Sequence, residues 1–238
     1  MKNPNTNIRL NHMAEKVKLL TEDTPFLVQE AYKTLRTNVM FSLPGSGCKC
    51  VGITSPTPGD GKSTTAANLA ISLAQINKRV LLIDCDMRLP SVANKFDIQA
   101  IPGLSDYLVG QARIEDAVRK SEQHGIHILP SGNIPPDSTG LLEDKQLEHL
   151  FNAFRKIYDY VIVDLPPVTS VPDAVILSKY LDGYLLTIWQ NKTKHSDIKS
   201  MLKQLQMTNA RSLGFVTTGV SANEKKYYKY QYNKNGKK

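Results

Sequence analysis

The sequence predicts an α/β fold in which a doubly wound, mainly parallel sheet is flanked by helices. From residue 50 onward, short apolar runs alternate with segments of helical periodicity, the pattern of repeated β-α-β units. Two of the runs, RVLLID and DYVIVD, are apolar along most of their length, as expected of parallel strands buried on both faces. We find no internal repeat or linker, so we predict one domain.

A helix should precede the alternating part. Residues 1–24 read as a polar lead-in, and the following segment, TPFLVQEAYKTLRTNVMFSLPGSG, has clear helix ends. Thr24 is the expected cap, Pro25 suits the first turn, and Pro44 and Gly45 stop the helix. Four apolar residues recur at three- and four-residue steps and predict the buried stripe. They are Val28, Ala31, Leu35 and Val39.

The remaining elements follow in regular alternation. The expected strands are residues 50–55, 79–84, 125–132, 159–167, 182–189 and 211–220. The expected helices are residues 62–77, 141–158, 172–181 and 196–207. Because parallel strands end at one edge of the sheet, we expect a ligand site beyond their carboxyl ends.

The charge of the chain is concentrated at its C-terminus. Of 238 residues, 41% are apolar and 22% charged, which is ordinary for a globular protein. The net charge is +8, and the last fourteen residues hold six lysines, so the rest of the chain carries only +2. A nearly neutral body argues against a broad nucleic-acid-binding face on the domain. The basic tail could bind phosphate, an anionic lipid surface or an acidic partner.

Cysteine usage and hydropathy point to the cytoplasm. Cys48, Cys50 and Cys85 form neither a disulfide framework nor a convincing zinc site, so we expect reduced thiols. The N-terminal MKNPNTNIRL has no apolar signal-peptide core, and no stretch approaches the ~18 to 20 apolar residues of a membrane span. Membrane association would then come through a partner or the tail.

A phosphate-binding loop follows the first strand of the series. The segment SPTPGDGKSTT places Gly61, Lys62 and Ser63 between a strand and a helix. In such a loop the backbone N–H groups cradle phosphates, the lysine reaches the β and γ phosphates, and the serine hydroxyl binds Mg²⁺. The full pattern requires glycine at position 56, where this chain has Pro56. A structural glycine turn is the alternative, but it leaves the acidic strand ends unexplained.

Carboxylates end two of the buried strands. Asp84 and Asp86 follow one strand and Asp164 follows another, at the edge of the sheet where the phosphate loop should lie. Any one of them could simply cap the next helix. Three beside a phosphate loop favour Mg²⁺ binding and proton acceptance.

These segments together resemble a known family. SPTPGDGKST, LLIDCDMR and VIVDLPP are similar to the Walker A, Walker A′ and Walker B motifs of the bacterial tyrosine kinases (BY-kinases) of capsule and exopolysaccharide synthesis. The similarity continues in GLSDYLVG, LPSGNIPP and the tyrosine-rich end, and it covers most of the chain. The resemblance implies a P-loop NTPase fold like that of the partition ATPases.

The resemblance also implies roles for individual residues. Lys62, Asp84, Asp86 and Asp164 match the catalytic group, in which Asp84 accepts the proton of the tyrosine. Mg²⁺ would be held by Ser63, Asp86 and Asp164. The residues that match the ATP-binding loop are Pro58, Gly59, Asp60, Gly61, Lys62, Ser63 and Thr64.

The N-terminal helix matches the E-x-x-R-x-x-R oligomerisation motif of the family at Glu30, Lys33 and Arg36. Lys33 replaces the first arginine and lacks its planar fork, so that contact should be weaker. The alternative for this helix face is simple exposure to solvent. Two departures concern other sites. The usual asparagine is missing from GFVTTGV, so adenine recognition is unassigned, and Thr57 replaces the signature lysine of partition ATPases.

The C-terminal segment KKYYKYQYNKNGKK has the composition of an unfolded substrate. Tyr227, Tyr228, Tyr230 and Tyr232 are the expected phosphorylation sites, and fourteen residues span up to about 45 to 50 Å, enough to reach a neighbouring subunit. The alternatives are a sticky surface tail or one that stacks on single-stranded nucleic acid. The second alternative lacks a matching basic groove on the body.

Our interpretation is an ATP- and Mg²⁺-dependent protein-tyrosine kinase that phosphorylates its own tail in trans. The family implies a self-associated ring, a cognate phosphatase and a membrane-anchored activator that recruits the cytoplasmic chain to the inner face of the membrane. We expect no nucleic acid partner. Two alternatives remain open: a partition or positioning ATPase, and a nucleotide-switched scaffold without kinase activity.

Overall fold

The computed structural model describes residues 19–208 and 211–220, which form a seven-stranded sheet of order β3-β4-β2-β5-β1-β6-β7. All neighbouring strands are parallel except β3, which runs antiparallel to β4 at one edge. The strands are β1 (Lys49–Thr54), β2 (Val80–Asp84), β3 (Arg119–Ser121), β4 (Ile126–Leu129), β5 (Tyr160–Asp164), β6 (Gly183–Trp189) and β7 (Ser212–Thr218). The predicted doubly wound, mainly parallel α/β fold is confirmed.

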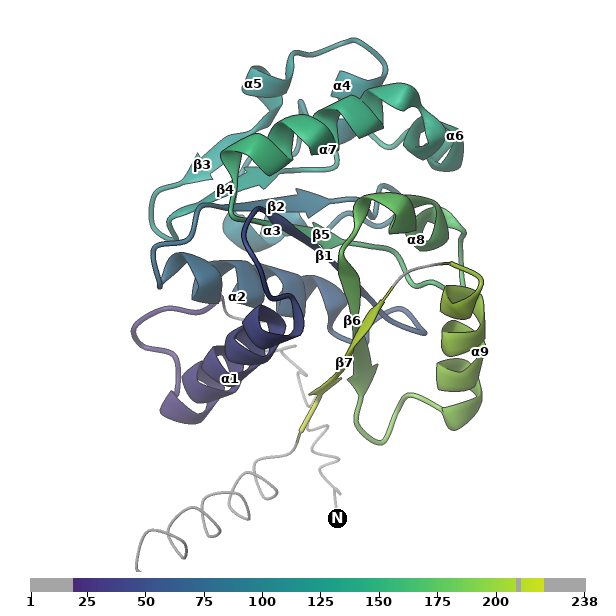
Figure 1. Cartoon of the computed structure of the whole chain (residues 1–238). Coiled ribbons are helices and arrows are strands. Elements are labelled where there is room, and N and C mark those ends of the chain that lie inside the picture. The colour runs from purple at the N-terminus through teal and green to yellow at the C-terminus, as the bar shows by residue number, and fades with distance from the viewer. Residues whose placement is uncertain (1–18, 209–210, 221–238) are drawn as a thin grey trace, which may run out of the picture.

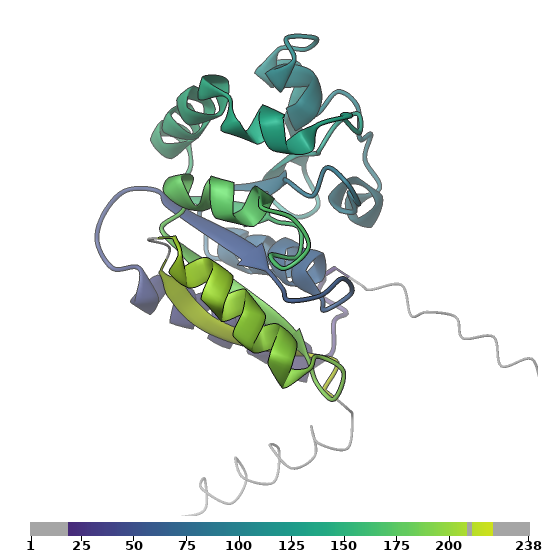
Figure 2. The same cartoon turned by 90° about the vertical axis from the view of Figure 1, so that its right-hand side faces the viewer.

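Helices cover both faces of this sheet (Figures 1 and 2). The helices α1, α2 and α3 pack on one face, and α4 to α9 pack on the other. The helical segments are α1 (Phe26–Ser42), α2 (Lys62–Ala74), α3 (Val92–Phe96), α4 (Leu104–Leu108), α5 (Ile114–Ala117), α6 (Ser138–Glu143), α7 (Lys145–Ile157), α8 (Asp173–Ile176), the 3₁₀ turn η1 (Leu177–Tyr180) and α9 (His195–Gln206).

The strand β2 shows how the sequence builds two cores around one sheet. Val80 and Leu82 pack with α1 and α2, whereas Leu81 and Ile83 pack under α7. Successive side chains of a strand point to opposite faces, so a continuously apolar strand serves both layers. Each fully buried aliphatic side chain contributes about 1.5 to 3 kcal/mol of transfer free energy. The carboxyl end of β2 is thereby held in place beside β5.

The N-terminal helix differs in two details from its prediction. The helix α1 starts after Pro25, which is the N-cap, and the Thr24 hydroxyl instead accepts a hydrogen bond from the Thr21 N–H at 2.9 Å. Ala31 is exposed, and Tyr32 takes its place in the buried stripe. The helical period is 3.6 residues, so either position could follow Val28, and the larger apolar body of Tyr32 packs against the core.

The segment predicted as one helix over residues 141–158 is two helices. Asp144 has an extended backbone, with a ψ of 142°, and its side chain accepts a hydrogen bond from the Gln146 N–H at 2.7 Å. Asp144 therefore ends α6 and caps α7. Aspartate at an N-cap is worth about 1 kcal/mol, which favours a fresh start over a continuous helix.

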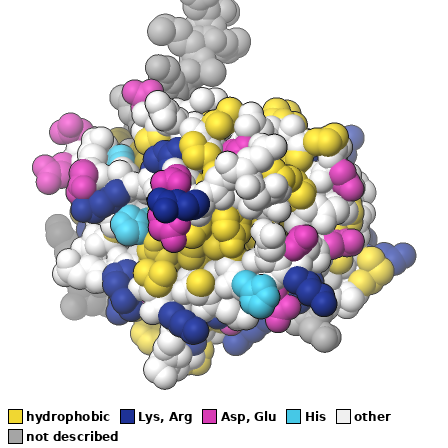
Figure 3. Space-filling view, turned by 90° about the horizontal axis from the view of Figure 1, so that it is seen from above, with side chains coloured by type: hydrophobic (Ala, Val, Ile, Leu, Met, Phe, Trp, Pro, Cys, Tyr) yellow, Lys and Arg dark blue, Asp and Glu magenta, His cyan; other side chains and the backbone are white. Residues whose placement is uncertain are grey.

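The predicted lead-in and tail fall mostly outside the described residues, which exclude 1–18 and 221–238. The described part already includes Leu20, which is buried and donates its N–H to Asn68 Oδ1 at 2.8 Å. Among the described residues, no helix has both the length and the apolar character to cross a membrane. The face formed by α4 to α7 carries acidic and basic side chains around an apolar centre (Figure 3).

Candidate active site

The loop between β1 and α2 has the shape of an anion cradle. Gly59 and Gly61 have φ of +77° and +87°, a backbone conformation that residues other than glycine rarely adopt. A Cβ on Gly61 would also lie 2.8 Å from Thr218 Cγ2. The first i→i−4 hydrogen bond of α2 is donated by the Thr65 N–H to the Gly61 carbonyl oxygen at 2.9 Å. The N–H groups of the preceding residues have no such carbonyl partner, so they can bind phosphate oxygens.

Asp60, which we expected among the ATP-binding residues, braces the loop from within. Its carboxylate is fully buried, and Oδ2 accepts hydrogen bonds from Thr57 N at 3.1 Å and Thr57 Oγ1 at 2.8 Å. The Lys192 ammonium lies 3.8 Å from Oδ1 and donates to the carbonyl oxygens of Pro58 and Gly59 at 3.4 and 3.3 Å. The loop is thus tied to the chain just after β6.

Lys62, at the start of α2, lies between two of the predicted carboxylates. Its Nζ is 2.6 Å from Asp86 Oδ2 and 4.0 Å from Asp164 Oδ1. Burial by itself lowers the pKa of this ammonium, but the charges of Asp164 and Asp86 outweigh burial and raise the pKa. Lys62 is therefore a fixed positive charge at the carboxyl edge of the sheet.

Asp84 performs the structural task that sequence reasoning kept as an alternative. Its Oδ2 accepts the N–H groups of Ser91 and Val92, both at 3.0 Å, at the beginning of α3. Its Oδ1 accepts the Asp86 N–H at 3.1 Å. Burial, with the nearby charge of Asp164, raises the pKa of Asp84 to about 7. Asp84 thus holds α3 against the end of β2 and has a pKa suited to proton transfer near neutrality.

Asp164 has the features of a metal ligand. Its carboxylate is fully buried, and the polar side chains that act on it most strongly are Lys62 and Ser63. Burial raises its pKa against the influence of both. No three His, Cys, Asp or Glu side chains in the described ranges form a closed metal cage. Mg²⁺ typically takes one or two carboxylates together with substrate phosphates and water, so Ser63, Asp86 and Asp164 fit this ion.

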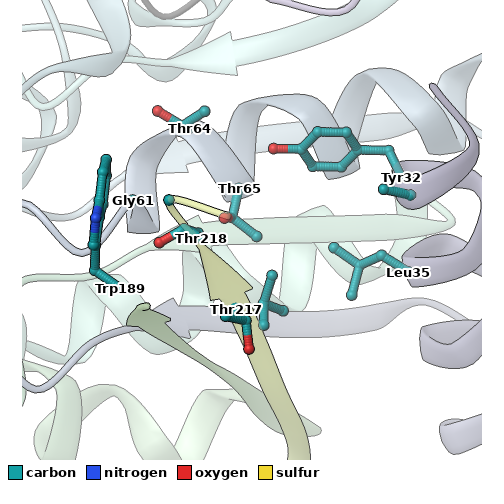
Figure 4. Close-up of a pocket in the computed structure, with 11 residues that line it drawn as sticks. Tyr32, Leu35, Gly61, Thr64, Thr65, Trp189, Thr217 and Thr218 are labelled. Atoms are coloured by element: carbon teal, nitrogen blue, oxygen red, sulfur yellow. The ribbon is translucent and has the colours of Figure 1, made fainter. Parts of the chain in front are cut away.

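A cavity of about 320 Å³ opens beside the loop, between α1, the first turn of α2 and the ends of β6 and β7. Figure 4 shows Trp189 on one side of this pocket and Tyr32 with Leu35 on the other, with Thr218 between them. Sequence reasoning did not assign this pocket, because four segments that lie far apart in the sequence build it. The aromatic residues Tyr32 and Trp189, to which the sequence analysis gave no role, were the available indication of this pocket.

Sequence reasoning also missed two lysines at the site, Lys95 and Lys192. Lys95, on α3, is half-buried and lies 3.4 Å from the Thr64 hydroxyl. A basic residue shortly after the Asp84–Asp86 pair was the available signal. The structure therefore brings together Lys62, the three aspartates and the loop, and it adds Lys95 to them.

The other predicted residues lie away from this edge. On α1, Glu30 and Lys33 form an exposed ion pair at 2.7 Å. Arg36 turns toward α2 and donates to the Ser72 carbonyl oxygen at 2.6 Å. Tyr227, Tyr228, Tyr230 and Tyr232 lie outside the described residues.

Comparisons with known proteins show the family of this chain. A family model described as an AAA domain matches residues 48–213. The chain is 38% identical over 222 residues to the tyrosine-protein kinase YwqD of Bacillus subtilis, with 93% of each chain covered. The kinase domain of the Escherichia coli tyrosine kinase ETK has a TM-score of 0.79 and 27% identity, over 86% of this chain and 83% of that one.

A second fold relative bears on the rival interpretation. The septum site-determining protein MinD of Pyrococcus horikoshii has a TM-score of 0.62 and 23% identity, over 74% of this chain and 72% of that one. At that identity the likeness shows a shared fold alone. Sequence identity, coverage and structural similarity are all greater toward the kinases. The chain belongs to the bacterial tyrosine-protein kinases, whose nucleotide-binding core is an AAA domain.

Proposed function

We propose that this chain transfers the γ-phosphoryl group of ATP to tyrosines of its own C-terminal segment, in trans, and so regulates capsule or exopolysaccharide synthesis and export. The observation that carries the proposal is the position of Lys62. A buried ammonium at the start of α2, 2.6 Å from Asp86 and 4.0 Å from Asp164, combines the phosphate and metal ligands of a phosphoryl-transfer site.

The donor would bind across the loop and the pocket beside it, which we call the base pocket. The phosphates would meet the N–H groups at the start of α2, and Lys62 would exchange part of its contact with Asp86 for the β and γ phosphates. The nucleoside would enter the base pocket between Trp189 and Tyr32. Aromatic side chains on both sides of the pocket favour a flat heterocycle. Asp60 and Lys192 keep the loop in its phosphate-binding shape.

Ser63, Asp86 and Asp164 would hold the Mg²⁺ ion, which offsets the charge of the β and γ phosphates when bound. The tyrosine oxygen then forms a bond to the γ-phosphorus, and the bond from that phosphorus to the oxygen of the ADP leaving group breaks. The phenol proton passes to a carboxylate, for which Asp84 is our candidate because its pKa is about 7. Asp84 is fully buried, so this role requires its surroundings to open when the acceptor arrives.

The acceptors would be Tyr227, Tyr228, Tyr230 and Tyr232. A phenol has a pKa near 10, so it needs a base and a clamped phosphate to react at neutral pH. The lysines among these tyrosines would draw the segment toward the acidic edge of the site. Each phosphate adds about −1.5 to −2 charges, enough to reverse the sign of the segment when all four sites are modified.

The assembly and location follow from the family resemblance. The exposed Glu30–Lys33 pair on α1 is available to a neighbouring subunit, which supports self-association into a ring. A membrane-anchored activator of the polysaccharide co-polymerase type would recruit the chain from the cytoplasm to the inner membrane face. A cognate phosphatase would reset the tail.

The test is incubation of the purified chain with ATP and Mg²⁺, with and without the cytoplasmic segment of the activator, followed by mass mapping. We expect phosphate on the tail tyrosines, and more of it when the activator segment is present. ATP hydrolysis without phosphotyrosine would identify a partition-type ATPase. Nucleotide binding without either product would identify a scaffold.

A further inference from the structure

Lys95 is a cation beside the phosphate loop, and the family resemblance assigns no role to it. It lies on α3, whose first N–H groups are held by the Asp84 carboxylate. Val92 of the same helix is fully buried in the core that also contains α2. These contacts fasten α3 at the end of β2, so the position of Lys95 relative to α2 is set by packing.

The Lys95 ammonium lacks a carboxylate partner in the part of the chain that the structure describes. None of the ion pairs within 4.0 Å includes it. Its recorded contact is with Thr64 Oγ1 at 3.4 Å. Burial lowers the pKa of this half-buried ammonium, and the charges of Asp164 and Asp84, which lie beyond ion-pair distance, do not compensate for the lost hydration. An anion bound beside Lys95 would compensate for the hydration that its ammonium has lost.

The place of Thr64 indicates which anion this is. Thr64 stands in the first turn of α2, directly after Lys62 and Ser63, where the N–H groups can bind phosphate oxygens. Lys62 points to Asp86 and Asp164, where the transferred phosphate and the metal belong. Lys95 lies beside a residue farther into the helix. It therefore faces the part of the nucleotide that is not transferred.

We propose that Lys95 binds the α-phosphate of the nucleotide as a second cation beside Lys62. The inference rests on the proposed function, because it takes the bound anion to be a nucleotide. Lys192 is less suited to this task, since it is already placed against two loop carbonyls and Asp60. Three aspartates meet the phosphates at this edge, so a second ammonium also reduces like-charge repulsion.

This role makes a specific kinetic prediction. The α-phosphate has the same charge and bonds before and during transfer, so a contact to it stabilises ground state and transition state equally. Loss of such a contact raises KM and leaves kcat unchanged. Loss of Lys62 should instead lower kcat, because that ammonium meets the group in which charge moves.

The experiment compares Lys95→Gln, Lys95→Arg and the control Lys199→Gln in the full chain. Lys199 is an exposed residue of α9. Calorimetric titration with ADP and Mg²⁺ should show about 10-fold weaker binding for Lys95→Gln, as expected for one lost charge-assisted hydrogen bond. The arginine variant should bind within a few-fold of wild type, and the control should match it. Tyrosine labelling against ATP concentration should show a raised KM with kcat retained.

Unchanged ADP affinity in Lys95→Gln would overturn the assignment, and so would a fall in kcat at constant KM. The assignment would also fail if Lys95→Gln bound ADP more weakly and melted at a lower temperature, and Lys95→Arg did not restore ADP binding. The last result would mean that Lys95 only supports the fold. Failure of the kinase assignment is distinguishable. A wild type that binds ADP but labels no tyrosine refutes the kinase reaction and leaves the Lys95 result in place.

Discussion

The Lys62 ammonium lies 2.6 Å from the Asp86 carboxylate, and both side chains are almost fully buried. This pair joins the phosphate loop to the end of β2, although 24 residues separate the two positions. In the function we propose, a phosphate at the start of α2 would compete with Asp86 for this ammonium, and the metal would compete with Lys62 for this carboxylate. Nucleotide and metal would then replace the internal ion pair together.

Replacement of Lys62 by Met should abolish tail phosphorylation. Loss of one preorganised electrostatic contact typically lowers kcat by about 10²- to 10³-fold. The variant should remain folded but melt at a lower temperature, because an uncompensated buried charge costs about 3 to 5 kcal/mol. Phosphotyrosine mass mapping and circular dichroism provide the measurements. Normal labelling by Lys62→Met would show that the loop assignment is wrong.

Replacement of Asp84 by Asn should loosen α3. The carboxylate accepts three N–H groups, whereas an amide offers one oxygen and turns its NH₂ toward a donor. The unmet N–H costs about 1 to 3 kcal/mol, which denaturant unfolding will detect. ADP affinity should fall as well, because α3 carries Lys95. A variant with wild-type stability and ADP affinity, but no labelling, would restrict Asp84 to proton transfer.

The two halves of the predicted oligomerisation motif should behave differently. Glu30 and Lys33 form an exposed pair worth about 0 to 1 kcal/mol, so the double alanine variant should keep its monomer stability and yield smaller species in light scattering. The matched control is the exposed pair Arg113 and Asp116, with the same spacing. Unchanged mass of the double variant, in a wild type shown to be oligomeric, would refute the interface.

Arg36 should affect stability as well as assembly. Its guanidinium donates to the Ser72 carbonyl and hydroxyl oxygens at 2.6 and 3.3 Å and so holds α1 against α2. Arg36→Ala should lower the free energy of unfolding by about 1 to 3 kcal/mol. Thermal unfolding under conditions in which the chain is monomeric will measure this. An unchanged midpoint would mean that Arg36 contributes only between subunits.

The tail tyrosines should control assembly through their charge. Phosphates on these residues would repel the three aspartates and the nucleotide in a neighbouring site. Replacement of all four by Phe should favour the assembled state, and replacement by Glu should favour monomers. Light scattering with ATP and Mg²⁺ on both variants and on phosphorylated wild type is the measurement. Equal mass distributions would eliminate the switch and leave the kinase reaction intact.

Asp159 should make stability depend on pH. Its hydrogen bonds with the Arg79 side chain and backbone N–H lower the pKa of the carboxyl. A lowered carboxyl pKa stabilises the fold above the unfolded value of about 3.9, and this stabilisation disappears as pH falls through the folded value. Asp159→Asn should cost about 1 kcal/mol at pH 7, and this cost should shrink as the pH falls below the unfolded value and through the lower folded one. An equal cost at both pH values would contradict this account.

Sequence periodicity was enough to predict the architecture and the meeting of the aspartates. Asp84 and Asp164 end neighbouring parallel strands in register, so their proximity follows from topology alone. The direction of each carboxylate does not follow from topology, because it depends on which N–H group lies nearest. For that reason the contact of Asp84 with α3 and the inward turn of Asp60 required the structure.

The features that sequence reasoning missed depend on contacts between distant or very short segments. Lys95 stands on a helix of five residues, too short for periodicity to reveal. Lys192 meets Gly59 across 133 residues. The break at Asp144 had a local signal, since aspartate is a preferred N-cap, but the apolar periodicity on both sides obscured it.

The end of β7 has a consequence for how the reaction depends on concentration. Thr218 donates to the Asp60 carbonyl oxygen at 2.9 Å, and Gly219 lines the pocket beside the phosphate loop, so the chain leaves the sheet next to the nucleotide site that we propose. The tyrosines belong to the same chain, so tethering alone would give them a local concentration on the order of millimolar at this edge. Dilution separates the two geometries: labelling within one chain keeps its rate, whereas labelling between chains slows as the subunits part.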